Sequence, residues 1–142
     1  MRPFLRTAIA AAVLSFGFSM CLAAQDKEKE ERKADQEFYE SVNNEIDRLT
    51  NLLDLDDWQI FYVDSILVHD YKAMQEELKD LQDKKVSNTD LYYNIQYKWQ
   101  DSIYYAYEKI FNEEQWAKYE KQGAAREKKA RDKRAEKLKK QK

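Results

Sequence analysis

Few residues of this chain are suited to catalysis or metal binding. It has one histidine, His69, and one cysteine, Cys21. A metal site needs several histidine, cysteine or carboxylate ligands that converge, and we expect the adjacent Asp70 to point to another side of the helix. The acidic cluster within 54–57 is better explained by a helix N-terminus, where negative charge is favourable. The sequence also has no glycine-rich phosphate loop and no nucleophile arrangement, so it predicts a non-enzyme without cofactor or metal.

Tyrosine shows the most pronounced pattern. A 16-residue stretch contains Tyr92, Tyr93, Tyr97, Trp99, Tyr104, Tyr105 and Tyr107. Tyr92 and Trp99 fall on the apolar stripe of the helix expected there. Tyr93, Tyr97 and Tyr104 are spaced by four and seven residues and share a neighbouring arc. A tyrosine ring is broad and apolar but keeps a wet hydroxyl, so this arc suits contact with a partner surface.

A second apolar group, Phe61, Tyr62 and Ile66, widens one arc of the preceding helix. Together with the three tyrosines of the arc, it is a candidate surface for weak binding of other polypeptides. The alternative is that the rings form a homodimer seam, since a long amphipathic hairpin needs a partner surface. Both interpretations can hold, one on each face.

The elements that would position these rings are marked by a pattern that occurs twice. It reads as a large apolar residue, a capping residue, two free positions and a glutamine, as in Leu55-Asp56-Asp57-Trp58-Gln59 and Phe111-Asn112-Glu113-Glu114-Gln115. The capping side chain accepts a bond from the first helical turn, and the glutamine reaches back to the N–H of the capping residue. Hydrophobic staples would pair Leu55 with Ile60 and Phe111 with Trp116. Two such boxes predict two helix corners.

The rest of the chain favours helix. It contains 2 glycines and 1 proline in 142 residues, so helix breakers are scarce. Apolar residues recur at intervals of three and four residues, the spacing of one helix face. This spacing predicts one helix at about 30–53 and a second at 57–84. A third helix is expected from one of residues 87–89 to 110, and a fourth from 112. The stripes are Phe38, Val42, Ile46, Leu49 and Leu53; Ile60, Val63, Leu67, Tyr71, Met74, Leu78 and Leu81; and Tyr92, Ile95, Trp99, Ile103, Ala106 and Ile110. The short interval near 84–90 predicts an antiparallel hairpin, and the fold class is all-α.

The first 24 residues differ in composition from residues 25–142. They begin with a positively charged segment, continue with an apolar run from Thr7 to Phe18, and end with small residues at Ala23 and Ala24. This pattern predicts a cleaved secretory signal peptide, with an uncleaved anchor as the alternative. The residues before Cys21 match a lipoprotein site poorly, so we expect Cys21 to be removed with the signal.

The C-terminal end is basic. Residues 124–142 carry 10 basic and 3 acidic residues, net +7, whereas residues 25–123 carry 13 basic and 24 acidic residues, net −11. We expect a helical domain at 25–123 and a solvated tail at 124–142, frayed helical or disordered. The tail either folds back on the acidic body or makes weak contact with anionic surfaces. A secreted protein rarely meets nucleic acid, so no nucleic-acid partner is expected.

The order of these features resembles the periplasmic Spy/CpxP family, also called the LTxxQ-motif family. The family's paired Leu-Thr-x-x-Gln motifs correspond to Leu55-Asp56-Asp57-Trp58-Gln59 and Phe111-Asn112-Glu113-Glu114-Gln115, and the likeness covers roughly residues 50–126. Both threonine positions are changed, as is one leucine. The resemblance implies a cradle-shaped antiparallel helical homodimer in the periplasm. It also implies a role as an ATP-independent chaperone or an envelope-stress regulator, while some relatives are linked to zinc.

The leading hypothesis is therefore a periplasmic holdase that binds partly unfolded proteins on an apolar and aromatic helical surface. Its expected client-binding residues are Tyr93, Tyr97, Tyr104, Phe61, Tyr62 and Ile66, and its structural motif residues are Leu55, Asp56, Gln59, Phe111, Asn112 and Gln115. The alternative is an envelope-stress regulatory protein that binds one specific sensor partner. A third reading is a passive, coiled-coil-like structural protein.

Overall fold

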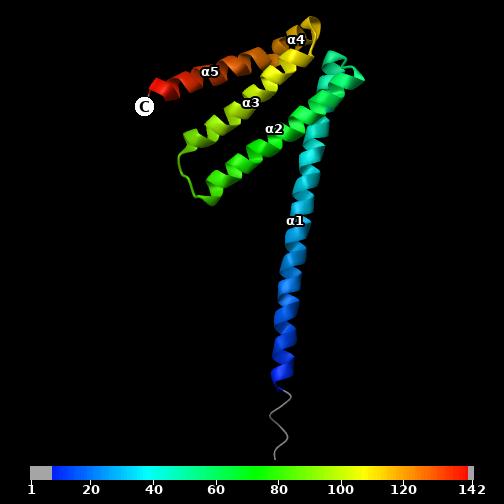
Figure 1. Cartoon of the computed structure of the whole chain (residues 1–142), viewed down its shortest axis with the longest axis vertical. Helices are drawn as coiled ribbons and strands as arrows, with labels where there is room; N and C mark the ends of the chain where they lie inside the picture. Colours follow the sequence, from blue (N-terminus) through cyan, green and yellow to red (C-terminus); the bar gives the residue numbers. More distant parts are fainter. Residues whose placement is uncertain (1–7, 141–142) are drawn as a thin grey trace, which may run out of the picture. The chain divides into compact units, whose positions relative to one another are not determined.

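The fold is all-α, as the sequence predicts. The computed structural model describes the backbone of residues 8–140 and the side chains of residues 26–140, and this part of the chain contains no strand. Its elements are α1 (Ala8–Leu53), α2 (Asp57–Asp83), α3 (Thr89–Ile110), α4 (Glu113–Tyr119), the π-helical turn η1 (Glu120–Ala124) and α5 (Ala125–Lys140) (Figure 1). Within the described residues, no helix has an apolar stretch long enough to cross a membrane.

The chain divides into two compact units, Met1–Glu40 and Ser41–Lys142. In the first unit α1 continues N-terminally to Ala8, whereas the sequence placed the start of this helix near residue 30. Ion pairs one turn apart, such as Arg32–Glu28 at 3.5 Å, accompany the charged run and favour helix there. Cys21 and the whole of the expected signal peptide (1–24) lie outside the residues whose side chains are described.

The second unit is organised by a hairpin of α2 and α3 (Figure 1). After α2 the chain turns through Lys85, which has a φ of 52°. Lys85 N–H donates to Gln82 O at 2.9 Å and Val86 N–H to Leu81 O at 3.0 Å, the hydrogen-bond pattern of a Schellman motif. Asn88 then caps α3, accepting from Asp90 N–H at 3.0 Å. The predicted hairpin and its cap within 87–89 are confirmed.

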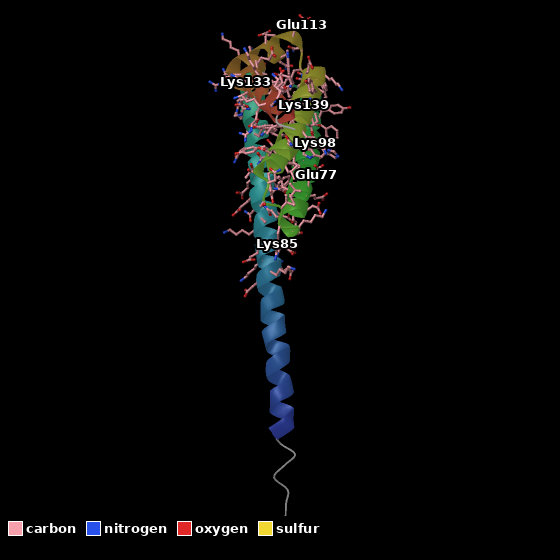
Figure 2. The ribbon with its side chains drawn as sticks, turned by 90° about the vertical axis from the view of Figure 1, so that its left-hand side faces the viewer. Glu77, Lys85, Lys98, Glu113, Lys133 and Lys139 are labelled. Carbon is pink, nitrogen blue, oxygen red and sulfur yellow. The ribbon has the colours of Figure 1, made fainter. Side chains whose placement is uncertain are left out.

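Two further contacts hold the hairpin together. Tyr92 of α3 donates its hydroxyl to Val86 O in the connecting loop at 2.8 Å. Farther along, Lys98 of α3 pairs with Glu77 of α2 (Figure 2), with Nζ 2.5 Å from Oε1. The first contact ties the loop to the start of α3, and the second is a partly exposed ion pair between α2 and α3.

The core lies where the ends of the helices meet at the corners. Its buried apolar side chains are Val42, Ile46, Leu49, Leu53, Leu55, Val63, Leu67, Ile103, Tyr107 and Phe111. Most come from the predicted stripes, but α3 buries Tyr107 where the stripe placed Ala106, which is half-buried. Tyr107 packs against the rings of Phe111 and Tyr119, so α3 buries a wider arc than a single stripe. Toward the hairpin loop the stripe of α2 is only half-buried, as at Met74 and Leu78.

α4 and α5 are separated by η1. Gly123 within η1 has a φ of 130°, a backbone conformation that residues with a Cβ rarely adopt. This residue lets the chain turn so that α5 runs back along α3 (Figure 1).

Candidate functional site

Both predicted corners contain capping boxes, and the two boxes are joined to each other. Asp56 N–H donates to Gln59 Oε1 at 3.0 Å, and Asn112 N–H donates to Gln115 Oε1 at 3.0 Å. The two amides then bond reciprocally: Gln59 Nε2 lies 2.7 Å from Gln115 Oε1, and Gln115 Nε2 lies 3.0 Å from Gln59 Oε1. The glutamine pair therefore links the start of α2 to the start of α4.

Each glutamine also caps the end of the helix that leads into the other corner. Gln59 Nε2 donates to Ile110 O at the end of α3 at 2.8 Å, and Gln115 Nε2 donates to Leu53 O at the end of α1 at 3.3 Å. Both side chains are buried, yet each amide oxygen accepts two bonds; Gln59 Nε2 donates to two acceptors, and Gln115 Nε2 lies within reach of three, the third being Asp54 O at 3.4 Å. A fully satisfied buried polar pair specifies one arrangement of the helices around it.

The apolar motif residues surround this pair. Leu55 and Phe111 are each 7% exposed, while their predicted staple partners Ile60 and Trp116 are half-buried. Phe111 also contacts Tyr119, with ring centroids 5.7 Å apart. These residues form a structural core, so the surface available for binding lies on the neighbouring faces of α2 and α3.

The first turns of α2 expose a cluster of three rings, which we call the α2 aromatic surface. Trp58, Phe61 and Tyr62 are 52%, 66% and 50% exposed. Trp58 and Tyr62 meet edge to face with centroids 6.1 Å apart, as do Phe61 and Tyr62 at 5.7 Å. Ile66, one turn farther, is half-buried. The sequence predicted Phe61 and Tyr62 as binding residues but treated Trp58 only as part of the capping box, although it lies one turn before Tyr62.

The tyrosine arc of α3 is partly covered by α5. Tyr93 and Tyr97 lie next to each other, with centroids 6.0 Å apart. The guanidinium of Arg134 lies 3.7 Å above the Tyr93 ring, and Lys128 Nζ lies 5.3 Å from the centroid of Tyr105. Of the two roles left open for the basic tail, contact with the acidic body is the one present in the structure.

The third tyrosine of the arc, Tyr104, belongs to an aromatic cluster at the second corner. Its ring lies 4.9 Å from that of Trp116 and 6.4 Å from that of Tyr119, and its hydroxyl donates to Glu120 Oε1 at 2.9 Å. Partial burial and the bond to Glu120 raise the pKa of Tyr104 to about 12. Tyr93, Tyr97 and Tyr104 therefore have different surroundings, although they share one arc in the sequence.

The contact between α5 and α3 centres on Asp101. Its carboxylate accepts a bond from Arg131 Nε at 2.8 Å and lies 3.5 Å from Lys128 Nζ. The side chains of Arg131 and Lys128 are only 11% and 13% exposed. Burial opposes the charge of Lys128, but bonds to Asp132 and Tyr105 and the charge of Asp101 raise its pKa overall.

Replacing Asp101 with asparagine is expected to lower the free energy of unfolding by about 1.5 kcal/mol, because two largely buried cations lose their shared carboxylate. α5 should also become more sensitive to limited proteolysis. The matched control is Asp132→Asn, which removes an exposed partner of Lys128 and should change stability by less than about 0.5 kcal/mol. Equal effects of the two variants, measured by urea unfolding, would contradict the role assigned to Asp101.

A polar cavity of about 280 Å³ lies beside this contact, lined by residues of α1, α2, α3, α4, η1 and α5. Its lining includes Glu45, Arg48, Tyr71, Tyr107, Tyr119 and Arg131. The Tyr107 hydroxyl is buried and has no hydrogen-bond partner among the described residues. Burial raises the pKa of Tyr107, and it raises that of Tyr119 to about 12.

His69 is exposed on α2, and its surroundings differ from the expectation. Asp70 does not point away: its Oδ1 lies 2.7 Å from His69 Nδ1. The exposed imidazole can turn toward the neighbouring carboxylate, even though the Asp70 side chain itself is largely buried. Within residues 26–140, no group of three or more histidine, cysteine or acidic side chains is arranged to hold a metal ion.

The geometry thus provides two corners joined by a glutamine pair, one exposed aromatic surface on α2, and one aromatic face of α3 that a basic helix partly covers. Compared with protein-family models, with curated proteins and with solved structures, the chain gives no match.

Proposed function

We propose that this protein is a periplasmic, ATP-independent holdase of the Spy/CpxP kind that binds partly unfolded polypeptides and acts as a homodimer. The observation that carries the proposal is the exposure of Trp58, Phe61 and Tyr62 on a single helical surface. Large rings that remain in water gain from burial against an apolar segment of another chain. The glutamine pair supports the proposal because it keeps the start of α2 rigid, so binding needs no reordering of this surface.

The size of the surface favours weak and reversible binding. Burying about 100 Å² of each ring would contribute ~2.5 kcal/mol at ~25 cal/mol per Å². Three rings together contribute about 7.5 kcal/mol, which is similar in size to the roughly 4–15 kcal/mol that association costs. A holdase needs this balance, because a client that is held too tightly is not released to fold.

The proposal is tested by light scattering from an unrelated client enzyme diluted out of guanidinium. We expect the purified protein to suppress aggregation at near-stoichiometric amounts. The variant Trp58→Ser/Phe61→Ser/Tyr62→Ser should lose most of this activity and keep its helical circular dichroism. The control Leu91→Ser makes the same kind of change at an exposed apolar residue of α3, outside the surface.

Two outcomes would contradict the proposal. One is no suppression of aggregation even at a large molar excess of the protein. The other is a single stable partner, in place of many weakly bound clients, when the protein is captured from the native envelope. That second outcome would favour the regulatory alternative.

A further inference from the structure

The chain repeatedly places a cation where an aromatic ring and a carboxylate lie side by side. Arg134 lies over Tyr93 and within 4.0 Å of Asp90 Oδ1. In the same way, Lys128 lies close to both the ring of Tyr105 and the carboxylate of Asp101. Both cations come from α5 and both acceptor pairs from α3. A ring face and a carboxylate together attract a cation more strongly than either does alone.

A third case lies on the hairpin. Lys98 Nζ is 4.6 Å from the centroid of the Trp99 ring and is paired with Glu77 of α2 (Figure 2). Rings and acids of this chain therefore act together as acceptors for basic side chains, whether the base comes from a neighbouring helix or from the same one.

The α2 aromatic surface also places aromatic rings beside carboxylates. Asp54, Asp56 and Asp57 immediately precede or begin α2, and all three are exposed. Asp57 and Phe61 are one helical turn apart and share a face. Residues 49–71 contain five aspartates and no lysine or arginine. In the described part of the chain, no basic side chain lies over Trp58, Phe61 or Tyr62.

From this we infer that the α2 aromatic surface binds cationic polypeptide segments, in which arginine or lysine side chains lie on the rings and pair with the aspartates. The inference rests on the proposed function and names its client class: segments that combine basic and apolar residues. Charge complementarity supports this occupant, because the five aspartates of residues 49–71, with no lysine or arginine among them, would repel acidic segments. Trp58 provides the ring type that binds cations best.

The test is fluorescence anisotropy with two labelled, unstructured peptides that differ only in arginine versus glutamate at the charged positions, with leucine and serine elsewhere. The full protein should bind the arginine peptide at least about tenfold more tightly at low salt. This preference should shrink as salt screens the charges. Trp58→Ser/Phe61→Ser should reduce binding of the arginine peptide as well.

The decisive variant is Asp54→Asn/Asp56→Asn/Asp57→Asn. Asparagine is a good N-cap and tolerates the left-handed conformation of Asp54, whose φ is 54°, so the corner should stay folded. We expect about a tenfold loss of affinity for the arginine peptide. The control Glu76→Gln/Asp80→Asn/Asp83→Asn removes three exposed acids at the far end of α2 and should change the affinity less than twofold.

Equal losses in the two triple variants would show that net charge alone attracts the peptide and would overturn the inference. Equal binding of the two peptides would overturn it too, and aggregation suppression could still succeed, so its failure is distinct from that of the holdase function. If a second copy covers the surface through its own α5, the aspartate variant should lose self-association and gain peptide binding, which would likewise overturn the inference.

Discussion

Gln59→Met is expected to lower the free energy of unfolding by about 3 kcal/mol, because it removes the partners of several buried polar groups at once. Methionine preserves the volume of the side chain. Gln115 loses one donor and one acceptor, Ile110 O loses its donor, and Asp56 N–H loses its acceptor. Urea unfolding followed by circular dichroism measures the change. The control Gln75→Met alters an exposed glutamine of the same helix, and its effect should stay within about 0.5 kcal/mol.

The second half of this experiment tests whether the two glutamines act as a pair. Once Gln59 is methionine, the amide of Gln115 already lacks its partner, so adding Gln115→Met should cost at least about 1 kcal/mol less than Gln115→Met alone. Simple additivity of the two substitutions would mean that the amides stabilise their corners independently. It would also mean that the glutamine pair does not hold α2 and α4 together.

The sequence predicted the two corners but not the hydrogen bonds that join them, because those bonds connect residues far apart in the chain. A capping box joins residues three apart, so Asp56 with Gln59 and Asn112 with Gln115 can be recognised from local spacing alone. The bond between Gln59 and Gln115 joins residues 56 apart in the chain. This bond forms only if the lengths of α2 and α3 bring the second corner back beside the first, and local sequence patterns do not determine that.

The burial of aromatic residues shows the same limit. A period of three and four residues identifies one buried stripe on a helix, and for α3 it placed Ala106 on that stripe. Tyr107 packs against the rings of Phe111 and Tyr119 at the second corner, so the buried arc of α3 reaches it. Likewise, the composition of 124–142 indicates only that helix is favoured there. Its contact with α3 depends on the pairing of Arg131 with Asp101, thirty residues earlier.

Raising the pH from 10 to 12 is expected to unfold the protein cooperatively. An ordinary tyrosine ionises near pH 10, whereas burial raises the pKa of Tyr119 to about 12 and raises that of Tyr107 as well. Above pH 10 the unfolded chain therefore binds fewer protons than the native one, and stability falls as pH rises. Between pH 10 and the raised pKa, each of these two tyrosines contributes a loss of about 1.4 kcal/mol per pH unit. The loss reaches roughly 5 kcal/mol at pH 12, comparable to the whole stability of a small domain.

Tyrosinate absorbance and circular dichroism, recorded together against pH, separate this mechanism from simple surface titration. The chain has 10 tyrosines, and we expect the buried ones to ionise in a single step together with the loss of helix. Tyr107→Phe should move that step to higher pH. The control Tyr62→Phe, at an exposed ring of α2, should leave the step where it is. Ionisation of all the tyrosines with the helices intact would show that Tyr107 and Tyr119 reach water in the folded protein, through the polar cavity that both of them line.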